Sequence, residues 1–121
     1  MLKETIAKID KFATQRDWDQ FHSPKNLAAS ISIEANELLE IFQWNDLSRL
    51  QIRENADKFQ EISEEIADVM IYCLRLCSTL KMDPISIINE KIEINNSKYP
   101  VEKSIGSSLK SKNLENKGVE K

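Results

Sequence analysis

Apolar side chains recur every three to four residues along most of this chain, a spacing that predicts amphipathic helices. The spacing indicates a first helix over residues 2–15 and a second over about 24–43. The third, over about 57–81, carries the widest apolar stripe and is expected to be the central core element. A fourth begins at residue 84 and stops before Pro100. The pattern therefore predicts an all-α fold with four helices.

Two of the expected helices open with the same pair of residues, a capping side chain followed by proline. Ser23 and Asp83 have side-chain oxygens that can accept from the free N–H groups of a first helical turn. Pro24 and Pro84 fit the first helical position, where a backbone donor is not needed. These pairs predict the starts of the second and fourth helices.

The segments outside the expected helices are polar or aromatic. Residues 17–22 form an aromatic-rich connection, and residues 45–57 form a polar connector with room for a short helical turn. Residues 101–121 hold mainly Ser, Lys, Glu, Asn and Gly, so we expect a flexible tail there. The folded domain is accordingly assigned to residues 1–100.

The composition restricts the partners and the compartment. The net charge is −3 and the pI is near 5.3, so no global positive field exists to attract a long polyanion, and no nucleic-acid partner is expected. The chain lacks the roughly 18 to 20 consecutive apolar residues of a membrane span, and its first residues lack the apolar core of a signal peptide. Cys73 and Cys77 lie in an apolar run and are expected to be reduced core residues. A soluble, cytoplasmic protein without membrane partners follows as the expectation.

Carboxylates occupy unusual positions on the expected second and third helices. Glu34 shares a helix face with the apolar residues three, four and seven positions away. Glu37 lies one turn further on, and the third helix repeats the arrangement with Glu65 and Asp68. If the two helices pair antiparallel, the four carboxylates meet across the interface. Each unpaired ionised group there would cost several kcal/mol of desolvation, so a positive charge is expected beside them.

A hard divalent cation would resolve this clustering of like charge. Mg²⁺ prefers carboxylate and water oxygens, and it commonly keeps substrate phosphates among its ligands. In such a site it polarises a phosphoanhydride and lowers the pKa of a coordinated water. The acids therefore favour Mg²⁺-dependent hydrolysis of a phosphoanhydride.

Two other interpretations remain open from the spacing alone. The acids can form a solvated helix face that pairs with Lys and Arg, as most charge-rich helices do. A di-iron bundle would need Glu-x-x-His on its helices, and the single histidine, His22, lies outside the expected helices.

Four blocks of sequence resemble the MazG-like, all-α nucleoside triphosphate pyrophosphohydrolases, and more narrowly their dCTP pyrophosphatase branch. Residues 34–44 (EANELLEIFQW) and 64–72 (EEIADVMIY) resemble the two metal motifs of that family. Residues 16–27 (RDWDQFHSPKNL) resemble the segment before the first motif, and residues 91–100 (KIEINNSKYP) resemble the closing segment. Four blocks in the same order are far more specific than either acidic motif alone.

The resemblance implies a four-helix core that assembles as a helical-bundle homodimer or a dimer of dimers, with sites at the subunit interfaces. It implies that Mg²⁺ is bound, and catalysis carried out, by Glu34, Glu37, Glu65 and Asp68. Aromatic positions that line or border the base pocket of the family are matched by Trp18, His22, Trp44 and Tyr72. Polar positions expected to contact phosphate are matched by Lys91, Asn95 and Lys98. Simple core packing of the aromatic residues, and ordinary exposed surface for the last three, are the alternatives.

The expected function is hydrolysis of a (deoxy)nucleoside triphosphate, with a pyrimidine base as in dCTP, to the monophosphate and pyrophosphate. The cellular purpose implied by the resemblance is removal of unwanted nucleotides from the pool. The alternative is a non-enzymatic helical module that dimerises or binds a partner, with its acids at the surface.

Overall fold

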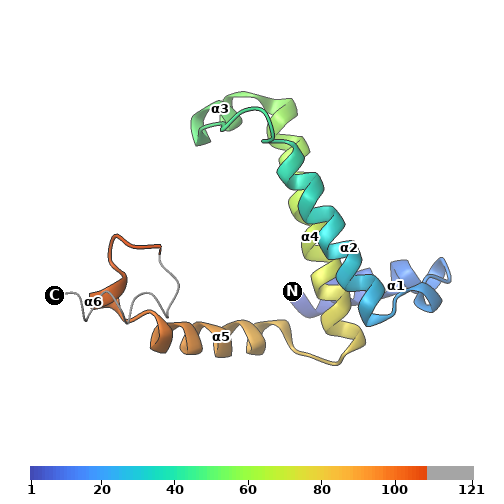
Figure 1. Cartoon of the computed structure of the whole chain (residues 1–121). Helices are drawn as coiled ribbons and strands as arrows, with labels where there is room; N and C mark the ends of the chain where they lie inside the picture. Colours follow the sequence, from blue (N-terminus) through green and yellow to red (C-terminus); the bar gives the residue numbers. More distant parts are fainter. Residues whose placement is uncertain (109–121) are drawn as a thin grey trace. The chain divides into compact units, whose positions relative to one another are not determined.

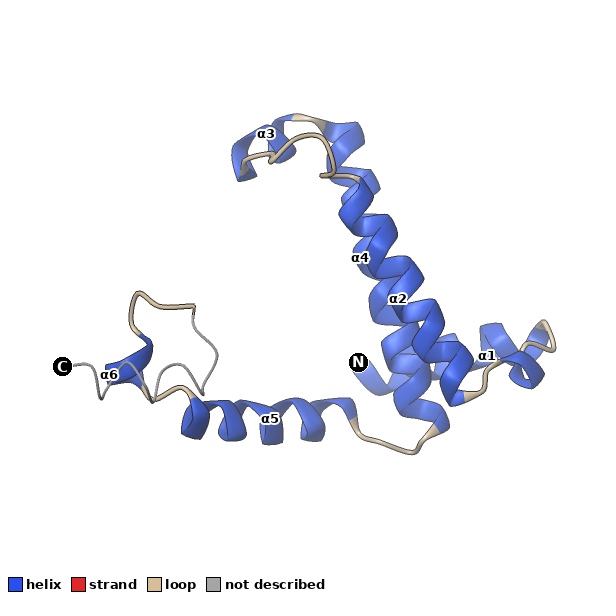
Figure 2. Ribbon diagram, in the orientation of Figure 1, coloured by secondary structure: helices blue, strands red, loops and turns tan. Residues whose placement is uncertain are grey.

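Every regular element of residues 1–108, the part of the chain that the structure describes, is helical (Figure 2). The structure is a computed structural model, and it divides into two units, Met1–Met82 and Asp83–Lys121. The all-α class predicted from the periodicity is confirmed.

The first unit contains four α-helices and one short 3₁₀ helix: α1 (Leu2–Gln15), η1 (Asp19–Phe21), α2 (Pro24–Glu40), α3 (Arg49–Glu54) and α4 (Ala56–Thr79). The first helix has the predicted bounds. The second ends at Glu40 rather than residue 43, because the N–H groups of Ile41, Phe42 and Gln43 bond to carbonyls three residues back and tighten the chain into turns.

Side-chain caps fix the starts of the helices. The Oγ of Ser23 accepts from the N–H of Asn26 at 3.2 Å, and Asp83 caps the helix that follows it, as predicted for both. The predicted helical turn in the connector is α3, which begins after a capping box between Ser48 and Gln51. Local chemistry therefore accounts for these boundaries.

The first unit is built on an antiparallel pair, α2 and α4, which lie side by side (Figure 1). Helix α1 packs against α4 near the end opposite to α3. The fully buried apolar residues of the unit are only Ala13 and Leu27. A single copy of the chain therefore covers only part of its apolar surface.

The predicted apolar stripe of the third helix is only half covered in α4. Exposed apolar residues follow one another at helical spacing along one side of α4: Phe59, Ile66 and Met70, which are 49%, 43% and 57% exposed. Cys73 continues this side and is exposed, while Cys77 is half-buried. Both cysteines are free, as predicted, but the prediction that they are core residues is wrong for a single copy, because α2 packs on another side of α4.

The described part of the second unit contains α5 (Pro84–Lys98) and α6 (Val101–Ser104). The bounds of α5 agree with the predicted fourth helix. The short helix α6 lies within the segment predicted as a flexible tail, and residues 109–121 of that tail lie outside the described residues. The extent of the domain, residues 1–100, stays a prediction. Among residues 1–108 no helix is long and apolar enough to cross a membrane.

Candidate functional site

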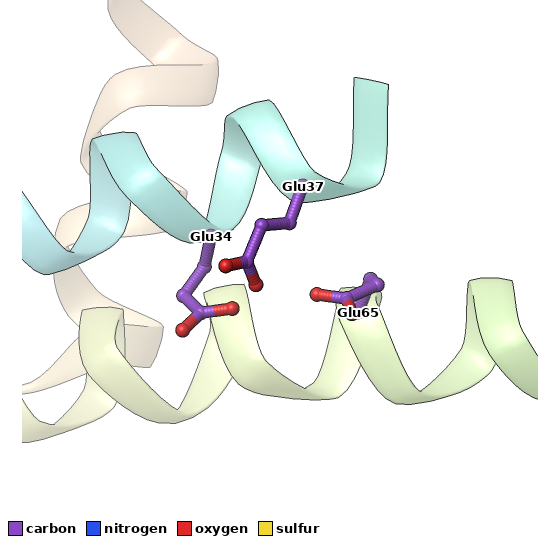
Figure 3. A group of neighbouring side chains, drawn as sticks. All are labelled: Glu34, Glu37 and Glu65. Carbon is purple, nitrogen blue, oxygen red and sulfur yellow. The ribbon is translucent and has the colours of Figure 1, made fainter. Parts of the chain in front are cut away.

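Three carboxylates from two helices converge in the middle of the α2–α4 pair (Figure 3). Glu34 and Glu37 lie one turn apart on α2, and Glu65 faces them from α4. Each glutamate has one carboxylate oxygen that lies within 4.8 Å of such an oxygen of both other glutamates. This is a spacing at which a single cation can bind all three.

The cluster has no cationic side-chain partner among residues 1–108. One carboxylate oxygen of Glu34 and one of Glu65 are closed to water and have no hydrogen-bond partner. Within residues 1–108 the ion pairs are Lys58–Glu61, Arg75–Asp10 and Arg75–Asp19, so no Lys or Arg neutralises the cluster. The pairing with Lys and Arg that this alternative requires is therefore not found among residues 1–108, although Glu37 is exposed as a solvated face would have it.

The crowding of negative charge raises the pKa values of Glu34 and Glu65. A hydrogen bond to Glu37, burial, and repulsion by Glu37, Asp68 and Glu65 raise the pKa of Glu34 to about 7. Burial and the charges of Glu37 and Asp68 also raise the pKa of Glu65. Both shifts favour the protonated carboxyl group, so binding of a cation would compete with protonation of these glutamates.

Asp68, the fourth predicted ligand, lies one turn beyond Glu65 on α4. It is outside the group of three oxygens, but its charge contributes to the raised pKa of Glu34 and of Glu65. Asp68 also lines a cavity between α1 and α4. Its position therefore connects the carboxylate cluster with a space large enough for a ligand.

A cavity of about 390 Å³ lies between α1 and α4 and is closed on one side by the connection that contains η1. This volume is within the range of small-molecule sites, and the walls are largely apolar. Three of the four predicted aromatic residues line it: Trp18, His22 and Tyr72. The fourth, Trp44, lies in the turn after α2, is 82% exposed and is not part of the cavity wall.

The C-terminus of α1 directs Trp18 into the cavity wall. The N–H of Trp18 bonds to the carbonyl of Ala13 at 3.0 Å, and the N–H of Asp17 bonds to that of Thr14 at 3.1 Å. Asp17 has a φ of 55°, so the two bonds form a Schellman motif that ends the helix and reverses the chain. Trp18 then packs its ring edge against Phe12, with ring centroids 5.6 Å apart.

Tyr72 is related to both the carboxylate cluster and the cavity. It lies one turn beyond Asp68 on α4 and is half-buried in the cavity wall. Burial and the negative charges of Glu34, Asp68 and Glu37 raise the pKa of its phenol. The hydroxyl therefore stays protonated at neutral pH and can donate a hydrogen bond.

A buried cation that the sequence interpretation missed ties three segments together beside the cavity. Arg75 of α4 is only 7% exposed. Its Nη1 donates to Asp10 of α1 at 2.8 Å, its Nη2 donates to Asp19 of η1 at 2.5 Å, and its Nε donates to Nδ1 of His22 at 3.0 Å. The Oγ of Ser78 donates to the other carboxylate oxygen of Asp10. The available signal was a lone charged residue within the apolar run 69–77.

The predicted phosphate contacts lie in the second unit. All three are exposed on α5: Lys91, Asn95 and Lys98. Their role stays a prediction.

Comparison with known proteins agrees with the resemblance. Residues 29–114 match the model of the MazG-like family. The chain is 36% identical over 105 residues to dCTP pyrophosphatase 1 of Rattus norvegicus, and 36% identical over 106 residues to that of Homo sapiens. These matches cover 83% of this chain but only 59% of each relative, so the chain spans well under two thirds of the length of these relatives.

A solved structure is also similar. The crystal structure of a pyrophosphatase from Archaeoglobus fulgidus superposes with a TM-score of 0.74 at 44% sequence identity, covering 82% of this chain and 92% of that one. Given a family match over most of its residues, together with these relatives and an all-helical fold, the chain belongs to the MazG-like family.

Proposed function

We propose that this protein hydrolyses a nucleoside triphosphate to the monophosphate and pyrophosphate in a Mg²⁺-dependent reaction. The observation that carries the proposal is the cluster of Glu34, Glu37 and Glu65, which pairs with no Lys or Arg of residues 1–108 and lies near a cavity of nucleoside size. The names of the relatives, dCTP pyrophosphatase and pyrophosphatase, support the same reaction.

The donor set fits Mg²⁺. Carboxylate oxygens are hard ligands, and no histidine or cysteine belongs to the cluster, which disfavours zinc and a di-iron site. Glu34, Glu37, Glu65 and Asp68 would hold the metal. When bound there, Mg²⁺ would neutralise the substrate phosphates and lower the pKa of a coordinated water. The unpartnered oxygens of Glu34 and Glu65 would gain the positive partner that burial requires.

The carboxylates themselves would accept the proton of the attacking water. A carboxylate that does not bind the metal at a given moment can accept a proton from the attacking water and orient it in line with the scissile bond. We assign this task to one of the glutamates of the cluster.

The base and sugar are assigned to the cavity. Trp18, His22 and Tyr72 give it flat surfaces and polar edges, which suit a flat heterocycle. Asp68 lies at the edge shared by the cavity and the cluster, so a nucleoside in the cavity would direct its phosphates toward the glutamates. We propose a pyrimidine deoxynucleotide such as dCTP as the substrate, on the similarity to the dCTP pyrophosphatases.

A second copy of the chain completes this proposal. The exposed side of α4, formed by Phe59, Ile66 and Met70, is suited to association of copies as a homodimer or a dimer of dimers. Trp44, which is 82% exposed and outside the cavity, would then serve the site of another copy. Lys91, Asn95 and Lys98 would provide the positive and polar groups that meet the phosphates. The proposed setting is the cytoplasmic nucleotide pool, with no membrane or nucleic-acid partner.

A panel of ribo- and deoxynucleoside triphosphates, scored for pyrophosphate release with Mg²⁺ and with chelator, tests the proposal. We expect release of pyrophosphate, not of orthophosphate, and fastest turnover for a pyrimidine deoxynucleotide. Absence of pyrophosphate release from every nucleotide would favour a binding module instead. Release that is equally fast in chelator would contradict the role of the metal.

A further inference from the structure

Arg75 makes three side-chain hydrogen bonds, more than are needed to join α4 to α1. A single guanidinium bonds to α1, to η1 and to the histidine that lines the cavity. Two carboxylates, Asp10 and Asp19, already supply the negative charge that a buried cation requires. The third bond, to His22, is therefore available to orient a group at the cavity wall.

The third bond fixes the tautomer of His22. Arginine stays protonated in proteins, so its Nε–H can only donate, and Nδ1 of His22 must accept. A neutral imidazole that accepts at Nδ1 carries its proton on Nε2. Burial and the charge of Arg75 lower the pKa of His22, against an opposite effect of Asp19, so the ring is neutral at physiological pH.

The His22 ring also contacts an aromatic neighbour. Trp18 contacts His22 edge-on, with ring centroids 6.4 Å apart, and both residues line the cavity. The connection between them is tied to its neighbours by Thr14 to Asp19 at 3.0 Å and by Asn26 to the carbonyl of Phe21 at 3.0 Å. The segment that bears the ring is thus restrained before any ligand binds.

We infer that Arg75 is a positioning residue for substrate recognition: it holds His22 as an Nε2–H donor at the cavity wall, where the ring binds a carbonyl oxygen of the nucleotide base. The recognition step rests on the proposed function, whereas the fixed tautomer does not. A base without an acceptor at that place would leave the donor unpaired and bind less well.

The tautomer is tested directly by ¹⁵N spectroscopy of the imidazole at pH 7.5. His22 is the only histidine of the chain, so histidine labelled with ¹⁵N gives one pair of signals without assignment. We expect an unprotonated Nδ1 and a protonated Nε2, and partial averaging of the two signals in Arg75→Lys, because lysine cannot reproduce the three directed bonds. Arg53→Lys, the same change at an exposed arginine of α3, should leave the spectrum unchanged. A protonated Nδ1, or an average of the two tautomers in the unaltered protein, overturns the inference.

Two substitutions of His22 test the functions of its ring nitrogens Nδ1 and Nε2 separately. His22→Asn keeps an oxygen near Nδ1 for Arg75 but removes the donor at Nε2, whereas His22→Gln places an amide donor near Nε2 and removes the acceptor for Arg75. With dCTP as the probe, we expect His22→Asn to raise KM about tenfold with kcat nearly unchanged, and His22→Gln to raise it less while lowering Tm more.

Arg75→Lys should raise KM in the same way as His22→Asn, without a comparable loss of kcat. If His22→Asn leaves KM unchanged while the ¹⁵N spectrum shows the expected tautomer, the donor is not used for recognition and that part of the inference fails. If dCTP and the other triphosphates are not hydrolysed at all, the proposed function fails, and the spectrum still decides the role of Arg75.

Discussion

Glu34 of α2 and Glu65 of α4 face each other with carboxylate oxygens no more than 4.8 Å apart, and each keeps one oxygen closed to water and without a hydrogen-bond partner. Like charges at this separation weaken the fold unless a proton or a cation lies between them. The pair is therefore a source of instability in the metal-free protein and a source of affinity for a cation.

Neutralising a carboxylate of the cluster should abolish turnover without unfolding the protein. We expect Glu37→Gln, Glu65→Gln and Asp68→Asn to lower kcat by about a hundredfold or more, as for the loss of one preorganised electrostatic group. Their Tm without metal should equal or exceed that of the unaltered protein, because repulsion is relieved. Glu61→Gln, at an exposed residue that pairs with Lys58 and lies outside the cluster, is the control. Full Mg²⁺-dependent turnover in Glu37→Gln or Asp68→Asn would refute their roles.

The metal-free protein should become less stable as pH rises from about 4.5 to about 7. The pKa of Glu34 is raised to about 7, whereas an unfolded chain has glutamate pKa values of about 4.3. The native state therefore binds more protons than the unfolded chain within this window, so the free energy of unfolding falls as pH rises.

Melting in chelator at several pH values tests this effect in the unaltered protein and in Glu34→Gln. The difference in Tm between the two proteins isolates Glu34 from other titrating groups, and it should change in favour of Glu34→Gln as pH rises. A difference in Tm that does not vary with pH would rule out the raised pKa.

Mg²⁺ should stabilise the native state. A ligand present at a hundred times its dissociation constant adds about 2.7 kcal/mol to the free energy of unfolding. For a chain of this size, that corresponds to a rise in Tm of roughly 10 °C. Sodium chloride at matched ionic strength is the control for screening, and Glu65→Gln should lose most of the rise. An equal rise in sodium chloride would indicate general screening of charge rather than a metal site.

A charge on the exposed side of α4 should disrupt the assembly of copies. Met70 is 57% exposed in a single copy and follows Ile66 by one turn. If a second copy covers this side, Met70→Glu places an unpaired charge in an apolar interface, and we expect a lower molar mass by light scattering. Gln15→Glu, which adds the same charge at an exposed end of α1, should leave the mass unchanged. If the unaltered protein is itself a monomer, no assembly exists to be disrupted and the prediction fails.

The local structure could be predicted from the pattern of residues. The bounds of α1, the caps at Ser23 and Asp83, and the short helix in the connector depend on residues within one or two turns, so spacing and capping rules were sufficient. The same rules placed Glu34 beside Glu37, and Glu65 beside Asp68, because a period of 3.6 residues fixes which side chains share a helix face.

Which helix faces meet depends on how whole helices pack against one another. The approach of Glu65 to Glu34 and the absence of Trp44 from the cavity depend on how α2 packs against α4, and the bond of Arg75 to His22 joins residues 53 positions apart. Cys73 fits an apolar stripe equally well whether or not a neighbour covers it, and in a single copy it is exposed. Periodicity specifies the composition of each helix face, but burial and pairing arise from the approach of segments distant in the chain, which no local pattern encodes.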